Sequence, residues 1–127
     1  ASGPFVELNC GALPDTLIES ELFGAMPGAH STASRRIEGK VAAAENGTLF
    51  LDEVALLSAT AQPKLLQLLQ SKEYYPLGSA TPVRANVRLI AATNVDLQQA
   101  VADRQFREDL YYRLHVLPVR VPSLAER

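Results

Sequence analysis

Short apolar runs alternate along the chain with longer segments whose apolar residues recur on one helical face. The runs predict β-strands, and the one-sided segments predict α-helices. The expected strands are Phe5–Leu8, Thr48–Leu51, Val87–Ala92 and His115–Val121. The expected helices are Leu13–Phe23, Ile37–Glu45, a helix that begins after Thr60, Leu97–Val101 and Phe106–Leu114. This alternation predicts an α/β domain of three layers.

Consecutive apolar residues in Thr48–Leu51 and Leu89–Ala92 indicate strands that are buried on both faces. Such strands are typical of a parallel sheet covered by helices. The chain contains no internal repeat, low-complexity tract or interdomain linker, and its 127 residues suffice for one sizeable core. We therefore expect a single domain.

The helical segments also predict which side chains face the core. In the first helix, Leu13, Leu17 and Ile18 lie at one-face spacing, whereas Ser20 and Glu21 should point outward. A broad apolar face on the helix after Thr60 consists of Leu65, Leu66, Leu68 and Leu69. We expect that face to lie in the core.

Turn-forming residues mark the segments between these elements. Thr60 can cap the following helix, and Pro63 in the first turn costs little because its missing N–H needs no partner there. The pair Asn46-Gly47 suits the left-handed conformation that ends helices. Tyr74–Ala85 contains two prolines and a glycine, which predicts a turn or hairpin. Gly24–Arg36 has no apolar period and predicts an exposed loop.

Composition and charge narrow the class of protein. The chain has 12 basic and 14 acidic residues and a formal net charge of −2, so it lacks the basic surface that holds nucleic acid. Cys10 is the single cysteine, and its apolar neighbours predict a packed thiol in a reducing, cytoplasmic setting. No apolar run reaches the roughly 18 residues of a membrane span, and the start lacks signal-peptide features. We expect a soluble protein that does not contact DNA or membranes through this segment.

Asp52 and Glu53 follow the apolar strand at Thr48–Leu51, at the carboxyl end where open α/β sheets place their ligands. In this Walker B arrangement, the aspartate can hold the Mg²⁺ of a bound nucleotide and the glutamate can polarise the attacking water. Asn94 follows the next strong strand and should reach the same edge. Taken alone, the acidic pair is more often a solvated turn, and Asn94 a helix cap or Asx turn. Together they favour a nucleotide site.

Five motifs extend this pattern over nearly the whole chain. They are Asn9-Cys10-Gly11-Ala12-Leu13, Glu19-Ser20-Glu21-Leu22-Phe23-Gly24, Gly47-Thr48-Leu49-Phe50-Leu51-Asp52-Glu53, Ala91-Ala92-Thr93-Asn94 and Phe106-Arg107-Glu108-Asp109-Leu110-Tyr111-Tyr112-Arg113-Leu114. In this order and spacing they resemble the sigma-54-dependent transcriptional activators, also called bacterial enhancer-binding proteins. The resemblance implies a three-layer αβα AAA+ ATPase core with a mainly parallel sheet. It also implies a hexameric or heptameric ring that hydrolyses ATP and remodels the closed complex of sigma-54 RNA polymerase.

The resemblance assigns roles by position. Asp52 matches the Mg²⁺-linked aspartate, and Glu53 matches the catalytic glutamate. Asn9 matches the asparagine that pairs with this glutamate and changes its posture with the nucleotide state. Asn94 matches the sensor of the γ-phosphate.

Arg107 and Arg113 match the arginine fingers that the ring supplies to a neighbouring subunit's nucleotide. A guanidinium is always charged and can neutralise the charge that develops on the transferred phosphoryl group. The alternative is pairing with Glu108 or Asp109 on the same helix. Spacing disfavours this alternative for Arg107, because neighbours at i+1 and i+2 do not face each other on a helix, whereas Arg113 can pair with Asp109 at i−4.

The family's glycine-rich phosphate loop has no counterpart in the sequence. The chain also ends before the helical lid, which carries a second sensor arginine in the family. We therefore expect residues 1–127 to form an AAA+ sigma-54 interaction domain that is truncated at both ends. In isolation it should bind ATP weakly or not at all.

The loop that contacts the sigma factor departs from the family's pattern. The family reads Gly-Ala-Phe-Thr-Gly-Ala, and the corresponding stretch is Gly28-Ala29-His30-Ser31-Thr32-Ala33. His30, at the expected loop tip, replaces the aromatic residue, and Ser31 keeps a hydroxyl. Thr32 replaces a flexible glycine with a β-branched residue. Met26-Pro27 stands where the family has a charged pair.

Two functions are therefore open. The first is an ATP-driven activator whose Gly28–Ala33 loop contacts sigma-54 and whose Pro76–Arg84 turn is a second pore-facing loop. The second is a regulatory or scaffolding module that keeps the ATPase fold but no longer engages sigma-54. Glu19–Gly24 and Phe106–Leu114 disfavour a different AAA+ machine, such as a clamp loader or a protease ATPase. DNA binding and sensory input are expected in separate domains outside this chain.

Overall fold

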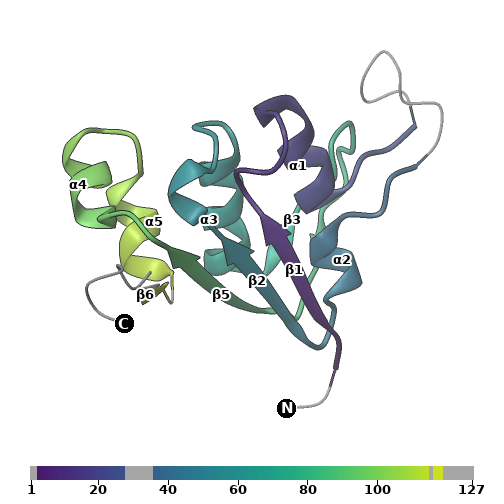
Figure 1. Ribbon diagram of the computed structural model, residues 1–127. Coiled ribbons are helices and arrows are strands. Elements are labelled where there is room, and N and C mark those ends of the chain that lie inside the picture. Colours follow the sequence, from purple (N-terminus) through teal and green to yellow (C-terminus); the bar gives the residue numbers. More distant parts are fainter. Residues whose placement is uncertain (1–2, 28–35, 115, 119–127) are drawn as a thin grey trace.

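A parallel sheet flanked by helices forms the centre of the computed structural model, which describes residues 3–27, 36–114 and 116–118 (Figure 1). The sheet has the strand order β1-β2-β5-β6, and each pair of adjacent strands is parallel. These strands are β1 (Phe5–Asn9), β2 (Thr48–Asp52), β5 (Arg88–Thr93) and β6 (Val116–Pro118). The helices are α1 (Asp15–Phe23), α2 (Lys40–Ala43), α3 (Ala61–Ser71), α4 (Leu97–Ala102) and α5 (Glu108–Arg113), with a short 3-10 helix η1 (Val54–Leu56). The predicted α/β architecture is confirmed.

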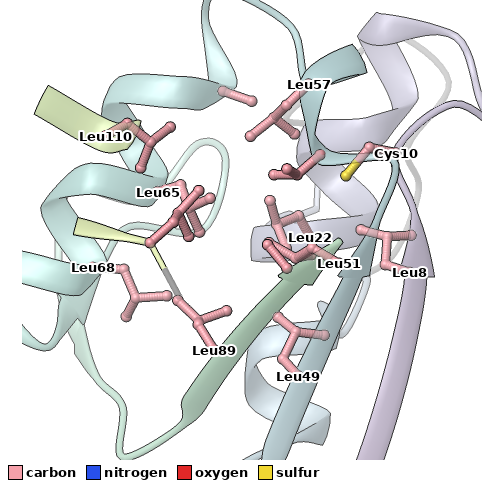
Figure 2. Packing of buried hydrophobic residues seen from close by; sticks show 14 of the residues in the cluster. Leu8, Cys10, Leu22, Leu49, Leu51, Leu57, Leu65, Leu68, Leu89 and Leu110 are labelled. Carbon is pink, nitrogen blue, oxygen red and sulfur yellow. The ribbon is translucent and has the colours of Figure 1, made fainter. Parts of the chain in front are cut away.

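The core lies between the sheet and helices α1, α3 and α5 (Figure 2). Leu22 of α1, Leu65 of α3 and Leu110 of α5 are fully buried. They share one cluster with Leu49 and Leu51, which alternate with partly exposed residues along β2. Each such side chain stabilises the fold by roughly 1.5–3 kcal/mol relative to an exposed one. The leucine-rich face of α3 thus has the predicted role.

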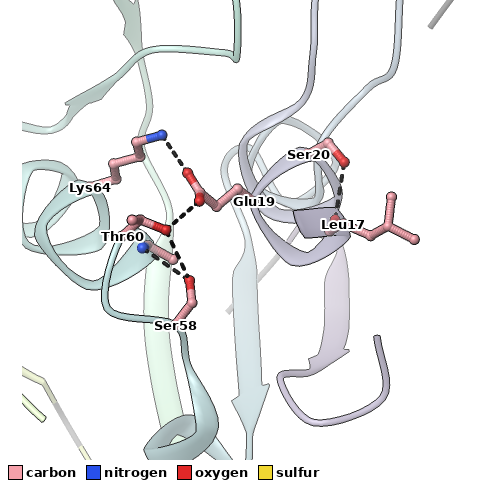
Figure 3. Close-up of polar contacts among 7 residues, drawn as sticks. Leu17, Glu19, Ser20, Ser58, Thr60 and Lys64 are labelled. Atoms are coloured by element: carbon pink, nitrogen blue, oxygen red, sulfur yellow. Dashed lines mark hydrogen bonds and ion pairs between the residues drawn. The ribbon is translucent and has the colours of Figure 1, made fainter. Parts of the chain in front are cut away.

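Helix α1 differs from the sequence expectation at two positions (Figure 3). Ser20 is buried, with 3% of its surface exposed, whereas Leu17 is 44% exposed. The Ser20 hydroxyl donates a hydrogen bond of 3.0 Å to the carbonyl of Leu17. Because the helix itself satisfies this hydroxyl, the side chain can be buried without a penalty.

Helix α2 is shorter than the predicted Ile37–Glu45. Ile37 instead forms an isolated antiparallel bridge with Ala25, whose N–H and carbonyl both bond to it at 2.9 and 2.8 Å. Ala25 is buried, so the prediction of an exposed loop is wrong at this position. Residues 28–35, which include His30, lie outside the described residues. Asn46 adopts the predicted left-handed conformation, with φ of 63°.

Helix α3 begins directly after Thr60 as expected, but the Thr60 side chain does not cap it. Thr60 Oγ1 donates to Glu19 Oε2 at 2.6 Å, and Lys64 pairs with the same carboxylate (Figure 3). Ser58 Oγ accepts from the N–H of Ala61 at 3.2 Å and so caps the helix in its place. Glu19 therefore links α1 to α3.

The remaining elements follow the predicted order. Strands β3 (Glu73–Tyr74) and β4 (Val83–Arg84) pair antiparallel, which confirms the hairpin expected in Tyr74–Ala85. Helix α5 begins at Glu108, two residues later than expected, and the final strand is described only as far as Pro118. Within the described residues, no helix is both long and apolar enough to cross a membrane.

Candidate functional site

The register of the sheet brings three predicted site segments to one edge. Asn9 at the end of β1 is paired with Asp52 at the end of β2. Leu51 of β2 is paired with Ala91 of β5. Asn94, which follows the end of β5, therefore lies at the same edge of the sheet. Because side chains alternate along a strand, paired residues such as Asn9 and Asp52 lie on the same face of the sheet. The structure therefore gathers Asn9, Asp52, Glu53 and Asn94, as the sequence predicts.

Glu53 occupies the left-handed region of the backbone map, with φ of 54° and ψ of 47°. A residue other than glycine in this region costs of order 1–3 kcal/mol, and such residues cluster at functional sites. Two hydrogen bonds hold the turn: the Glu53 N–H donates to Asp52 Oδ1 at 2.9 Å, and the Leu56 N–H donates to the Glu53 carbonyl at 3.0 Å. The strained turn fixes the direction in which the Glu53 side chain leaves the strand.

Gly11 separates Asn9 from Glu53. Asn9 Oδ1 accepts a hydrogen bond of 2.8 Å from the Gly11 N–H. A Cβ atom at Gly11 would lie 3.3 Å from Glu53 Oε2 and 3.5 Å from Asn9 Oδ1, so both side chains border the same small space. Among the described contacts no hydrogen bond joins Asn9 to Glu53, so the pairing that the resemblance implies is not formed here.

The acidic pair also acts on Cys10, which is 2% exposed and forms part of the core. Burial, and then the negative charges of Asp52 and Glu53, raise the pKa of the Cys10 thiol to about 12. A thiol with this pKa is protonated and unreactive at neutral pH. The predicted packed thiol is confirmed.

Asp52 has the chemistry of a ligand for a hard cation. Its side chain is partly buried, and one carboxylate oxygen accepts from the Glu53 N–H, while the other has no partner among the described residues. In the same part of the chain, no group of three or more His, Cys, Asp or Glu side chains is placed to hold a metal. A carboxylate such as that of Asp52 fits Mg²⁺, which is commonly held by one or two carboxylates together with substrate phosphates.

Asn94 is exposed, and its neighbours take over the alternative roles that the sequence allows for it. Asp96 caps α4 by accepting from the Gln99 N–H at 3.2 Å. Thr93 Oγ1 accepts from the Val95 N–H at 3.3 Å. A hollow of about 490 Å³ lies beside Asn94, lined by residues 93–98, Tyr111 and Val116. The Asn94 amide is therefore available to a ligand.

Arg107 pairs with Asp109, contrary to the expectation from helical spacing. Its guanidinium makes two hydrogen bonds to the carboxylate, of 3.0 and 2.9 Å. The spacing argument fails because Arg107 precedes α5 and has an extended backbone, with φ of −71° and ψ of 135°. Hydrogen bonding within this pair raises the pKa of Arg107 and lowers the pKa of Asp109.

Arg113 is exposed in the last turn of α5. The alternative pairing of Arg113 with Asp109 is wrong, because the ion pairs among the described residues join Asp109 to Arg107 and none joins it to Arg113. In the described part of the chain, neither arginine pairs with Asp52 or Glu53. The structure thus leaves both arginines unpaired with Asp52 and Glu53 of the same chain.

Gln62 has no role in the sequence expectations, yet its side chain is 2% exposed and bonded to three backbone groups. The available signal is its position. Gln62 lies three and four residues before Leu65 and Leu66, so helical periodicity places a polar side chain on the core face of α3.

The segments that lead into the two predicted loops lie side by side. Ala25, which precedes the Gly28–Ala33 loop, forms an isolated parallel bridge with Leu77 in the Pro76–Arg84 turn. The Met26 N–H donates to the Leu77 carbonyl, and the Leu77 N–H donates to Gly24, each at 2.9 Å. The two loops therefore start from adjacent backbone, although the Gly28–Ala33 loop itself lies outside the described residues.

The family model described as the Sigma-54 interaction domain matches residues 1–120. The chain belongs to this family. The DNA-binding transcriptional regulator NtrC of Rhizobium meliloti (strain 1021) is 52% identical over 126 residues, which are 99% of this chain and 26% of NtrC. The Nif-specific regulatory protein of Azotobacter vinelandii is 52% identical over 127 residues, which are 100% of this chain and 24% of that protein. This sigma-54 interaction domain thus spans about a quarter of the length of the curated relatives it matches.

Solved structures of NtrX from Brucella abortus share the fold of this sigma-54 interaction domain. One has a TM-score of 0.85 and 38% identity, and the comparison covers 98% of this chain and 28% of that one. A complex of NtrX with ATP has a TM-score of 0.82 and 36% identity, over 97% of this chain and 26% of that one. The expected three-layer α/β AAA+ fold is confirmed.

Proposed function

We propose that this sigma-54 interaction domain is the ATP-hydrolysing core of a transcription regulator that acts on sigma-54 RNA polymerase. The observation that carries the proposal is the sheet edge at which β1, β2 and β5 present Asn9, Asp52, Glu53 and Asn94. Further support comes from the regulators that the chain resembles and from the ATP complex of NtrX.

The two carboxylates have different roles in this proposal. Mg-ATP, when bound, supplies the reactive phosphoryl group and a cation that neutralises phosphate charge. Asp52 would hold this Mg²⁺ through its carboxylate. Glu53, fixed by its left-handed backbone, polarises the attacking water and takes up its proton. Asn94 orients the water or the terminal phosphate with its exposed amide.

Asn9 sets the posture of Glu53. Its oxygen accepts from Gly11, which leaves the amide NH₂ as a donor for the glutamate across the space beside Gly11. Donation to Glu53 would hold the carboxylate away from the water, and release would return it. The residues around Glu53 thus provide a two-position catalytic base.

Arg107 and Arg113 act on the nucleotide of a neighbouring subunit in a hexameric or heptameric ring. Both are exposed, and among the described residues neither contacts Asp52 or Glu53 of its own subunit. A guanidinium keeps its charge at any working pH and forms paired hydrogen bonds with phosphate oxygens. Assembly of the ring places each arginine beside the nucleotide site of the neighbouring subunit.

The partner is sigma-54 RNA polymerase, contacted by the Gly28–Ala33 loop. Membership of the family supports this role, as does the bridge between Ala25 and Leu77, which sets two loops on adjacent backbone. DNA binding belongs to a separate domain of the intact protein.

The decisive experiment compares Glu53→Gln with Asp52→Asn in the intact protein. Glu53→Gln should leave Mg-ATP affinity nearly unchanged and lower turnover by about 10²–10⁴-fold, because only the base is lost. Asp52→Asn should weaken Mg-ATP binding itself. Glu7→Gln, the same change at an exposed position of β1, is the matched control and should hydrolyse ATP normally. Normal hydrolysis by Glu53→Gln would remove the catalytic assignment.

A further inference from the structure

Gln62 is a buried polar side chain that joins two segments of the proposed site. It lies in the first turn of α3 and is 2% exposed. Its amide nitrogen donates to the carbonyls of Leu57 and Gln105, at 2.9 and 3.0 Å. Its amide oxygen accepts from the N–H of Arg107 at 2.8 Å.

The first of these segments is the turn that carries Glu53. The Leu56 N–H donates to Glu53, and the Leu57 N–H donates to Val54, so residues 53–57 form one hydrogen-bonded unit. Gln62 binds the last carbonyl of this unit. Displacement of the Glu53 turn therefore changes the position that the Gln62 amide can occupy.

The second segment presents Arg107. Its backbone is held by Gln62 and by the neighbouring residue Phe106, which is 3% exposed. The Arg107 side chain is 48% exposed and bonded only to Asp109 among the described residues. A fixed backbone with an exposed guanidinium is the arrangement required of an arginine that is presented to another molecule.

Burial makes the loss of any of these three hydrogen bonds costly. A buried amide that loses a partner keeps the full desolvation penalty of the unpaired group, so Gln62 stabilises only the arrangement in which both segments are in place. Cavity space of about 570 Å³ adjoins Gln62 and is lined in part by Arg104, Gln105 and Arg107. The segment therefore has room to shift when the amide is lost.

We propose that Gln62 is a positioning residue that fixes Arg107 at the subunit surface and ties it to the Glu53 turn of the same subunit. The proposal rests on the function proposed above, in which Arg107 serves the nucleotide of a neighbouring subunit. Gln62 then connects consecutive sites of the ring. A change at the Glu53 turn of one site alters the arginine that the same subunit supplies to the next.

The test uses Gln62→Met in the intact protein, since methionine has a similar length and makes none of the three bonds. Gln70→Met, the same change at an exposed position of α3, is the matched control. Gln62→Met rings should show a kcat for ATP about 10²-fold lower, with KM little changed, because a misplaced arginine affects the reacting phosphate. Amide hydrogen exchange at Arg107 should accelerate by at least tenfold in Gln62→Met and remain unchanged in Gln70→Met.

Mixed rings locate the defect. Gln62→Met subunits keep Glu53, and Glu53→Gln subunits keep a well-placed Arg107, so mixing the two should restore ATPase activity at some interfaces. Mixing Gln62→Met with Arg107→Ala should restore none, because both lack a working arginine. Restored activity in the mixture of Gln62→Met with Arg107→Ala would overturn the role of Gln62. The role would also be overturned if Glu53→Gln rescued Arg107→Ala but did not rescue Gln62→Met.

Two further outcomes remain decisive. If Arg107→Ala is not rescued by Glu53→Gln either, the action of Arg107 across the interface fails, and the proposal for Gln62 fails with it. If Gln62→Met does not assemble, Gln62→Asn replaces it, because it keeps the amide but is one methylene too short to reach all three partners. The same mixing pattern at smaller amplitude is expected, and normal kcat in Gln62→Asn together with unchanged exchange at Arg107 would overturn the proposal.

Discussion

Asp109 binds the Arg107 guanidinium through two hydrogen bonds, of 3.0 Å to Nε and 2.9 Å to Nη2, on an exposed surface. The pair holds the arginine against its own subunit. An arginine that serves a neighbouring nucleotide must exchange this carboxylate for a phosphate. Exposed ion pairs contribute little to stability, so this exchange is readily reversible.

Asp109→Asn should raise the ATPase activity of the intact ring by a factor between one and about ten. The substitution removes the competing charge but keeps the oxygen that accepts from the Leu110 N–H. Steady-state hydrolysis at saturating ATP is the measurement, and Asp103→Asn at the exposed residue after α4 is the control. A fall of tenfold or more would show that Asp109 orients Arg107 for catalysis and does not merely retain it.

Arg113 provides a second test of action across the ring interface. Arg113→Ala subunits should regain ATPase activity when mixed with Glu53→Gln subunits, because some interfaces then combine an intact site with intact arginines. Arginine fingers are commonly worth about 10³–10⁵ in rate, so even partial restoration is measurable. A mixture of Arg107→Ala and Arg113→Ala should remain inactive, since every interface lacks one arginine. Rings that assemble but show no restoration in the first mixture would contradict the role.

Several features were predictable because they depend on local sequence. Leu49 and Leu51 lie in a run too apolar for a surface strand, and a carboxylate pair directly after such a run must emerge at the sheet edge. The hairpin at β3 and β4 followed from its prolines and glycine, which break helical and strand periodicity. These features require no knowledge of distant residues.

The features that sequence reasoning missed depend on partners far along the chain. Thr60 turns from its cap position to Glu19, which lies 41 residues earlier. Gln62 can be buried because it forms hydrogen bonds with Gln105 and Arg107, which lie 43 and 45 residues later in the chain. Periodicity places Gln62 on the core face of α3, but it cannot show which distant partner satisfies a polar side chain such as Thr60 or Gln62.

Glu19 predicts a pH-dependent contribution to stability. Burial alone raises the pKa of Glu19, but hydrogen bonds from Lys64 and Thr60 and the charge of Lys64 lower it overall, below the ordinary 4.5. Because the folded-state pKa is depressed, the stabilisation is present above the ordinary value and is lost as pH falls through the folded-state pKa. Glu19→Gln should therefore destabilise the domain by roughly 0.5–1 kcal/mol at pH 7 and by much less in acid.

The difference in stability is measured by thermal unfolding of Glu19→Gln and of the unsubstituted protein, from pH 7 down to acidic pH. Glu21→Gln is the matched control on the same helix, because its carboxylate lies 3.8 Å from Lys40 in a more exposed pair. The control should change the Tm less at every pH. A difference for Glu19→Gln that does not shrink in acid would show that its charge is not responsible.

Cys10 should resist alkylation in the folded protein. A pKa raised from 9.0 to about 12 lowers the thiolate fraction at pH 8 by about 10³-fold, and burial limits access further. Reaction with iodoacetamide should proceed at the normal rate only after unfolding in denaturant. Burial is the largest cause of the shift, so Asp52→Asn should accelerate the native reaction only slightly. Rapid labelling of the native protein would contradict the packed position of Cys10.

The altered loop decides whether sigma-54 remains the partner. If His30 does the work of the family's aromatic residue, its neutral ring should pack on an apolar surface better than its charged form. Binding of sigma-54 to the intact ring, measured with a transition-state analogue of ATP, should then weaken as pH falls through the ordinary histidine pKa of about 6.5. His30→Phe should strengthen binding and remove the pH dependence, whereas His30→Ala should abolish binding. If all three proteins assemble and hydrolyse ATP but none binds sigma-54 at any pH, the loop has lost this partner and the domain acts as a regulatory scaffold.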